Sequence, residues 1–426
     1  RHRSLGEERA SQDLNMAMAG RQILKNIASR ARWTILTLPW LMAGCVTPVE
    51  YGEIPHSAYV AADRCNPTAN DKIDGSDKPF FFVTSRLPNC LTENISLLNH
   101  RGDKVRYGRF AAPRDVEREP GKTTRTIPLA FSDSQLWWKE VSSEMKAADG
   151  RVLLYVHGYR ETFFSSSRDT DQIKRLANFQ GPAIQYSWPS QGALLKYPVD
   201  ETNMYWDERN FRKFLMQLAQ LETTKEIVLI SHSLGARLVL PSLEYVDRNV
   251  PNSDSSVISN IILVSPDVDT QDFERDIAEE ILSDRRVRND RRITVYASLH
   301  DRALSLSDNY HGYPRLGYPR CFDPFVAADL KARNLPERCY AKYPKYVEAI
   351  DKTALTIIDS TAISRGTSGH SNYLLSAPVC KDFAAVVNGE RAPKGRQATH
   401  LAHVFTLAPP PKDAKPDHLA ICRRTE

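Results

Sequence analysis

Residues 226–246 read E-I-V-L-I-S-H-S-L-G-A-R-L-V-L-P-S-L-E-Y-V. The stretch opens with a continuous apolar run, Ile227 to Ile230, which is typical of a strand buried on both faces. Beyond a short polar segment, Leu234 and Leu238 are four residues apart, the spacing of one helix face. The stretch therefore predicts a strand, a sharp turn and a helix.

Ser233 occupies the tip of this turn. In a nucleophile elbow, a serine at this place projects above the sheet, beside the free N–H groups and the positive dipole end of the following helix. The tight turn requires small residues two positions before and after the serine; Gly235 meets this need, and Ser231 replaces the usual first glycine. Alone, S-x-S-x-G also matches surface loops by chance, but the flanking strand and helix favour Ser233 as a nucleophile. The N–H of Leu234 is then a candidate oxyanion donor.

Other apolar runs of strand length alternate with helical patterns along the chain. They cover residues 79–85, 104–110, 152–156, 183–187, 261–264, 293–297 and 355–358. Strands and helices that alternate with short connections predict a mostly parallel, doubly wound α/β sheet with helices on both faces. Such sheets bind ligands at the carboxyl ends of their strands.

The apolar strand at 152–156 runs directly into His157-Gly158-Tyr159. In folds with a nucleophile elbow, the backbone N–H just after such a His-Gly supplies the second oxyanion donor, here that of Tyr159. We expect His157 itself to shape the loop.

A serine nucleophile needs a base and a carboxylate that orients the base. Of the 11 histidines, His370 alone lies in the loop directly after the last central strand, so we predict it as the base. Asp301, which follows the strand at 293–297, is the preferred acid. Asp267, which follows the strand at 261–264, is the alternative acid.

Six motifs occur in the order, and at roughly the intervals, of a bacterial α/β-hydrolase family of unknown function. They are V-H-G-Y, Y-S-W-P-S, S-H-S-L-G, V-S-P-D-V-D, H-D-R-A-L and G-H-S-N-Y. The family is described as belonging to the esterase/lipase superfamily and includes predicted lipoproteins. The resemblance covers about Phe80 to Ala385. It implies an α/β-hydrolase fold and a serine hydrolase with Ser233 as nucleophile and His370 as base, and it does not identify the substrate.

An apolar run at residues 33–44 follows several basic residues and ends directly before Cys45. The run is too short for a membrane-spanning helix, which needs about 20 residues. Small residues before a cysteine resemble the lipobox of bacterial lipoproteins; an ordinary signal peptide with an incidental cysteine is the alternative. We expect residues 1–44 to be a signal peptide, with translation starting at Met16 or Met18. Lipidated Cys45 would anchor the protein on the periplasmic side of the bacterial envelope, and the non-acidic Val46 favours the outer membrane.

The charge and the remaining cysteines agree with export. Residues 1–44 carry a net charge of +4, which leaves about +1 of the total +5 for the rest and gives no support for nucleic-acid binding. Six cysteines besides Cys45 predict disulfides in an oxidising compartment, and their spacing fits no zinc site. We prefer nearest-neighbour pairs among the fifteen possible pairings: Cys65 with Cys90, Cys321 with Cys339, and Cys380 with Cys422.

The domain organisation follows from shifts in composition. We predict a lipid-anchored tether at residues 45–78, an α/β-hydrolase domain at 79–389, and a Pro- and Lys-rich C-terminal tail at 390–426. Within the domain, a Tyr- and Pro-rich insertion at 302–350 is either a lid over the strand ends or a structural excursion.

Two classes of function remain open. The first is a serine hydrolase of carboxylic esters or thioesters that works through an acyl-enzyme on a small-molecule acyl substrate. The second is a non-catalytic envelope lipoprotein that keeps the same scaffold for binding. Neither requires a metal or another cofactor, and the only partner expected besides the substrate is the membrane.

Overall fold

The computed structural model describes residues 62, 65, 80–90, 95–111, 129–250, 257–282, 290–318, 354–364, 369–399 and 403–408. All of them belong to one compact unit, residues 55–426. Within them, one sheet has the strand order β10-β11-β9-β8-β7-β6-β4-β5-β1-β2-β3. The strands are β1 (Phe80–Asn89), β2 (Ser96–Phe110), β3 (Leu129–Ser132), β4 (Arg151–Val156), β5 (Ala183–Ser187), β6 (Glu226–His232), β7 (Asn260–Val264), β8 (Arg292–Ala297), β9 (Leu355–Asp359), β10 (Arg396–Ala398) and β11 (Val404–Leu407).

The centre of the sheet is parallel, and its two edges are antiparallel. Every neighbouring pair from β11 through β9, β8, β7, β6, β4 and β5 to β1 runs parallel. Antiparallel pairs occur between β1 and β2, β2 and β3, and β10 and β11. The predicted doubly wound sheet is confirmed. All the central strands end on the same side of the sheet, which we call its carboxyl edge.

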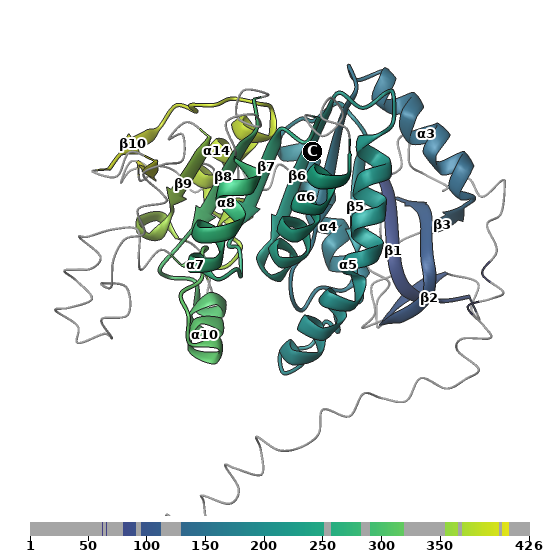
Figure 1. Cartoon of the computed structure of the whole chain (residues 1–426), viewed down its shortest axis with the longest axis horizontal. Coiled ribbons are helices and arrows are strands. Elements are labelled where there is room, and N and C mark those ends of the chain that lie inside the picture. The colour runs from purple at the N-terminus through teal and green to yellow at the C-terminus, as the bar shows by residue number, and fades with distance from the viewer. Residues whose placement is uncertain are drawn as a thin grey trace, which may run out of the picture. The chain divides into compact units, whose positions relative to one another are not determined.

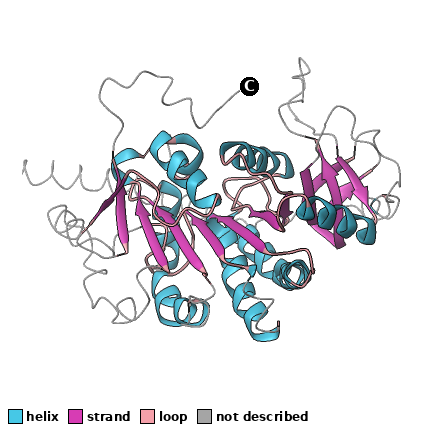
Figure 2. Cartoon of the chain, turned by 90° about the horizontal axis from the view of Figure 1, so that it is seen from above, coloured by secondary structure: helices cyan, strands magenta, loops and turns pink. Residues whose placement is uncertain are grey.

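Helices cover both faces of this sheet (Figures 1 and 2). The longer helices are α3 (Ser134–Lys146), α4 (Phe163–Leu176), α5 (Tyr197–Ala219), α6 (Ala236–Asn249), α10 (Arg302–His311) and α14 (Ala377–Val387). The short turns are α7 (Thr270–Asp272), α8 (Ala278–Ile281) and α13 (Asn372–Leu375), the 3-10 turns η2 (Ser233–Gly235) and η6 (Thr361–Ile363), and a π-helical turn at Phe273–Ile277.

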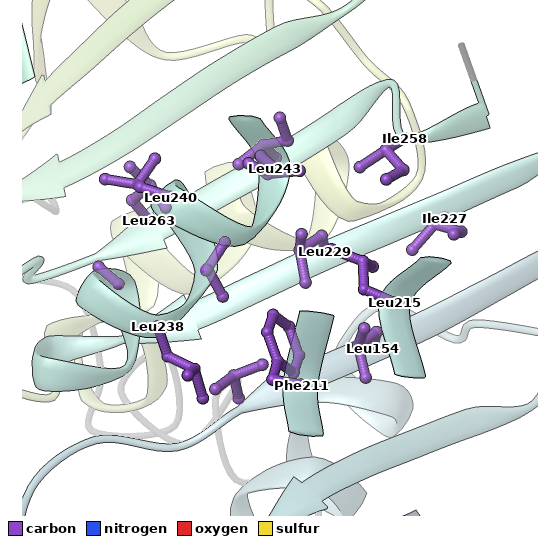
Figure 3. Close-up of a cluster of buried hydrophobic side chains, with 14 of the residues drawn as sticks. Leu154, Phe211, Leu215, Ile227, Leu229, Leu238, Leu240, Leu243, Ile258 and Leu263 are labelled. Atoms are coloured by element: carbon purple, nitrogen blue, oxygen red, sulfur yellow. The ribbon is translucent and has the colours of Figure 1, made fainter. Parts of the chain in front are cut away.

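The core lies in two layers, one on each side of the sheet. On one side, α3, α5 and α6 pack their apolar faces on the strands, and Phe211 of α5 and Leu238 of α6 meet there with Leu229 of β6 (Figure 3). On the other side, α4 and α14 contribute Ile173 and Phe383 to the second layer. Because β6 is covered on both sides, its apolar residues are fully buried, as the continuous run in the sequence predicts.

Polar side chains define where the helices begin. Thr162 and Ser165 form a reciprocal capping box at the start of α4, and Asp133 accepts two backbone N–H bonds at the start of α3. Asp301 caps α10 by accepting a bond from the N–H of Leu304. The cap at Asp301 therefore places a carboxylate at the carboxyl edge of the sheet, next to the end of β8.

The predicted boundaries need correction at both ends. The stretch 390–426, predicted to be a tail, contains β10 and β11, and β11 extends the parallel sheet by pairing with β9. The tether predicted at 45–78 is also partly packed, because Ala62 and Cys65 are buried. Such short strands have little periodic signal of their own, so the pairing of β11 with β9 and of β10 with β11 decides their structure.

Cys65 forms the predicted disulfide with Cys90, at the end of β1. Cys380 is also disulfide-bonded. Its predicted partner Cys422, the pair Cys321 and Cys339, the signal segment with Cys45, and most of the 302–350 insertion lie outside the described residues. None of the helices in the described ranges is both long and apolar enough to cross a membrane.

Candidate active site

Ser233 lies where β6 passes through the turn η2 into α6. Its φ angle is +52°, in the left-handed region that non-glycine residues rarely adopt. The backbone around it is packed closely: a Cβ on Gly235 would lie 2.6 Å from the carbonyl oxygen of His157, and one on Gly158 only 2.7 Å from the Cβ of Ser233. Both glycines are therefore required for the elbow to meet the loop after β4.

The loop after β4 brings the second predicted oxyanion donor beside the elbow. Tyr159 follows Gly158 directly, and Arg160 has a φ angle of +63° that turns the chain away. The N–H of Arg160 donates to Asp200 on α5 at 3.0 Å, which fixes the turn. Leu234 is in the first turn after the serine, where backbone N–H groups have no partner within the helix.

Arg86 of β1 is completely buried and supports this loop through hydrogen bonds. Its guanidinium donates to the carbonyl of Glu161 at 2.8 Å and of Ser190 at 3.0 Å, to Ser187 Oγ at 2.8 Å and to Asn99 Oδ1 at 2.8 Å. Burial lowers its pKa to about 10, against the opposing effect of nearby carboxylates including Asp200, so Arg86 stays charged at neutral pH.

His157 has the structural role that the sequence predicts. Its ring stacks on Trp188 at a centroid distance of 4.9 Å, and its Nε2 lies 3.1 Å from the carbonyl oxygen of that residue. Burial, helped by the charge of Arg86, lowers its pKa well below the usual value. The ring is therefore neutral and buried, and it braces the loop instead of meeting a ligand.

His370 and Asp301, predicted as base and acid, are brought together by the fold. Nδ1 of His370 lies 2.7 Å from Oδ2 of Asp301, and the other carboxylate oxygen of Asp301 caps α10 at the N–H of Leu304. Burial lowers the pKa of His370, but the charge and hydrogen bond of Asp301 outweigh it, so the pKa is raised above its usual value.

Two further strand ends hold the main chain of His370. His232 Nε2 and Ser265 Oγ each lie 3.1 Å from the carbonyl oxygen of His370, and the His232 and His370 rings are 4.6 Å apart. Burial, with the nearby His370, lowers the pKa of His232 to about 3, so its ring is neutral. A neutral ring can donate from Nε2 to that carbonyl.

The role of His232 is one that the sequence did not reveal. In the sequence, His232 stands out only as the residue directly before Ser233. In the parallel ladder of β6 and β7, Ser231 lies opposite Leu263 and His232 lies opposite Val264. A local sequence pattern does not reveal this pairing.

Asp267, the alternative acid, has other partners. Its carboxylate accepts from Ser307 Oγ at 2.6 Å and from the hydroxyl of Tyr197, and Arg237 Nη2 lies 3.2 Å away. Burial would raise its pKa, but Arg237 and the hydrogen bonds hold it below its usual value. These contacts tie together the loop after β7, α5, α6 and α10, so Asp267 is the centre of a polar cluster beside the elbow.

The described residues contain no group of three or more His, Cys, Asp or Glu arranged to hold a metal ion. The polar groups at this edge instead offer a serine hydroxyl, a histidine bonded to a carboxylate, and two backbone N–H groups. This set of groups suits proton transfer and nucleophilic attack.

Part of the chain is similar to known proteins. The structure of an esterase from Pyrobaculum calidifontis, in a monoclinic crystal form, is similar to this one. The similarity covers 66% of this chain and 77% of the esterase chain, with 11% sequence identity and a TM-score of 0.26. No curated protein matches the sequence. Residues 135–330, from α3 past α10, match the model of a family described as α/β hydrolases of unknown function. With its parallel sheet, its elbow and this match over 196 of its 426 residues, the protein has the α/β-hydrolase fold.

Proposed function

We propose that the protein is a serine hydrolase of carboxylic esters or thioesters that acts through an acyl-enzyme. The observation that carries the proposal is the hydrogen bond between His370 and Asp301 at the strand edge that also bears Ser233 in its left-handed conformation. The family match supports a hydrolase in general, and the ester class and serine mechanism are our proposal.

In this mechanism, Ser233 Oγ attacks the acyl carbon while Nε2 of His370 takes up the serine proton. Asp301 keeps Nδ1 of His370 protonated and stabilises the imidazolium that forms. The N–H groups of Leu234 and Tyr159 hold the oxyanion. His370 then returns the proton to the leaving alcohol or thiol, and water cleaves the acyl-enzyme by the same steps in reverse.

Hydrolysis of p-nitrophenyl acetate and labelling by a fluorophosphonate probe test this proposal together. Wild-type protein should show both, and Ser233→Ala should lose both because the attacking oxygen is gone. Ser231→Ala is the matched control, since Ser231 Oγ is buried in the strand and makes no hydrogen bond in the structure.

If wild type and Ser233→Ala have equal turnover, or wild type reacts with neither reagent, the proposal fails. The non-catalytic binding lipoprotein is then the better interpretation.

We also propose that Cys45 carries a lipid that anchors the protein in the bacterial envelope, on the support of the sequence alone. Cys45→Ala should release the protein from membranes and end incorporation of labelled palmitate. Equal palmitate incorporation in Cys45→Ala and wild type would disprove the anchor.

A further inference from the structure

The most exposed large hydrophobic side chains gather at the carboxyl edge of the sheet. Among the described residues, the four highest exposed fractions belong to Leu195 (86%), Leu306 (69%), Leu194 (63%) and Tyr310 (63%). Leu194 and Leu195 lie between β5 and α5, and the other two lie on α10 after β8. Figure 1 shows α10 and one end of α5 extending beyond the same edge of the sheet. Single exposed apolar residues are ordinary, but a group of them at one place marks a binding surface.

A chain of contacts joins these side chains to the loop that holds the oxyanion. The hydroxyl of Tyr159 donates to the carbonyl of Leu194. The rings of Tyr159 and Tyr197 meet edge to face at 5.2 Å, and Tyr197 meets Tyr310 at 5.9 Å. Leu306 precedes Tyr310 by four residues and so lies on the same face of α10. We call Leu194, Leu195, Tyr197, Leu306 and Tyr310 the apolar rim.

Polar contacts underneath hold the apolar rim in place. Asp267 accepts from Tyr197 at the start of α5 and from Ser307 on α10, and thereby ties the two helices together. His311 Nε2 lies 3.1 Å from Glu201 Oε1, which adds a second link between the same helices. Because these polar groups are paired with one another, the rim presents mainly apolar surface to a ligand.

The apolar rim and His370 adjoin different core layers, one on each face of the sheet. Tyr159 and Tyr197 pack against the core layer of α5 and α6. His370 contacts His232, whose ring packs on Tyr373 in the layer of α4 and α14. His370 must protonate the leaving group, which therefore departs on its side. The other substituent of the reacting carbonyl, the acyl chain, then extends toward the rim.

We infer that the apolar rim binds the acyl chain of the substrate and makes the enzyme selective for acyl chains of several methylene groups. The inference rests on the proposed hydrolase function. Each methylene group that the rim removes from water should raise kcat/KM by up to about fourfold.

The test compares p-nitrophenyl octanoate with the acetate, both below their solubility limits. Wild type should prefer the octanoate, and Leu195→Ser/Leu306→Ser should reduce the octanoate-to-acetate ratio of kcat/KM about tenfold. The ratio cancels general damage to folding. Leu136→Ser, an exposed leucine on α3, is the matched control and should keep the wild-type ratio.

A wild type without preference for the octanoate, or equal ratios in wild type and the double variant, would overturn the inference. A gain that appears only above the solubility limit or on phospholipid vesicles would also overturn it, because the rim would then contact a membrane and not one acyl chain.

A binding measurement separates this inference from the proposed chemistry. Fluorescently labelled dodecanoate should bind Ser233→Ala, as measured by anisotropy, and at least tenfold more weakly when Leu195→Ser and Leu306→Ser are added. Binding without any ester hydrolysis would support the rim and reject the hydrolase. Equal binding to both proteins would reject the rim.

Discussion

Asp301 serves two elements with its two carboxylate oxygens. Oδ1 caps α10, and Oδ2 accepts from His370. The helix cap fixes the side chain before any substrate binds, so in the proposed mechanism Asp301 needs no rearrangement to orient His370. Asp267 is equally buried, but it is surrounded by Arg237, Tyr197 and Ser307, and its carboxylate is occupied by structural contacts.

The two acids should therefore respond differently to replacement by asparagine. Asp301→Asn should lower kcat by about 10⁴, because the base loses its tautomer and its stabilising charge. Asp267→Asn should keep most turnover but lose roughly 3 kcal/mol of stability, because Arg237 and Arg315 then face no carboxylate there. Ester hydrolysis and urea unfolding measure the two effects. A larger loss of kcat in Asp267→Asn would make Asp267 the acid.

The pH dependence should reflect the raised pKa of His370. The base acts only when neutral, so kcat/KM should fall as the pH drops through that pKa, with a midpoint above the usual imidazole value of about 6.5. Asp301→Asn should move the titration of His370 to lower pH, because burial then acts without the opposing charge. Histidine NMR signals of the variant measure this shift. A wild-type midpoint at or below 6.5 would contradict the prediction.

His232 should act by positioning His370. His232→Phe removes the donor to the carbonyl of His370 and should lower kcat by about 10- to 100-fold with little change in KM, since small displacements of a catalytic group are costly. His232→Gln can still donate a hydrogen bond and should recover part of the loss. Ester kinetics that show full kcat in His232→Phe would leave His232 with a packing role only.

At the scale of elements, the site is assembled from the ends of neighbouring strands. β6 leads into Ser233, the proposed nucleophile, and β4 leads into the loop with Tyr159, the proposed oxyanion donor. α10, after β8, begins at Asp301, the proposed acid. The parallel ladders between β4, β6, β7 and β8 bring these ends to one edge. β4, β6 and β8 therefore each lead into one of the proposed chemical groups, as expected for sheets of this type.

β1 supports the site through Arg86, and replacement of this residue should destabilise the protein. Arg86→Met would leave Asn99, Ser187 and two backbone carbonyls without their donor and should cost about 3 to 5 kcal/mol of stability. Arg86→Lys should recover only part, because an ammonium group lacks the planar fork of donors. Urea unfolding measures both variants. Arg248→Met, at an exposed ion pair with Glu280, is the control and should have little effect.

At the scale of the whole molecule, the sheet gathers segments from both ends of the described chain. β11 pairs with β9 at one side of the sheet, while β1 joins β5 at the other. Cys65, well before β1, is fastened to Cys90 at the end of that strand. The unit therefore includes residues on both sides of the family match at 135–330.

Removing the disulfide should weaken the entire unit. Cys65 and Cys90 are 25 residues apart, and closing a loop of this length stabilises a protein by about 3 kcal/mol in the chain-entropy model. Cys65→Ala/Cys90→Ala should lose about that much in urea unfolding while keeping its ester kinetics at low temperature. A loss below about 1 kcal/mol would indicate that packing alone holds this segment.

The sequence by itself determined the central strands, the elbow and its serine. These features are local, because a continuous apolar run, a glycine in a tight turn and a helical spacing each depend on neighbouring residues. The carboxyl-edge rule also allowed Asp301 and His370 to be chosen before their contact was visible. The same reasoning left Asp267 as an alternative, since both aspartates follow central strands.

Only the tertiary structure decided which groups meet. The bond between His370 and Asp301 joins residues 69 positions apart, and the contact of His232 with His370 spans 138. Arg86, the apolar rim and the edge strands β10 and β11 likewise depend on long-range neighbours, and no local pattern encodes them. Burial and pairing across the sheet determine these contacts, because a side chain acquires its partners only when strands and helices distant in sequence have packed together.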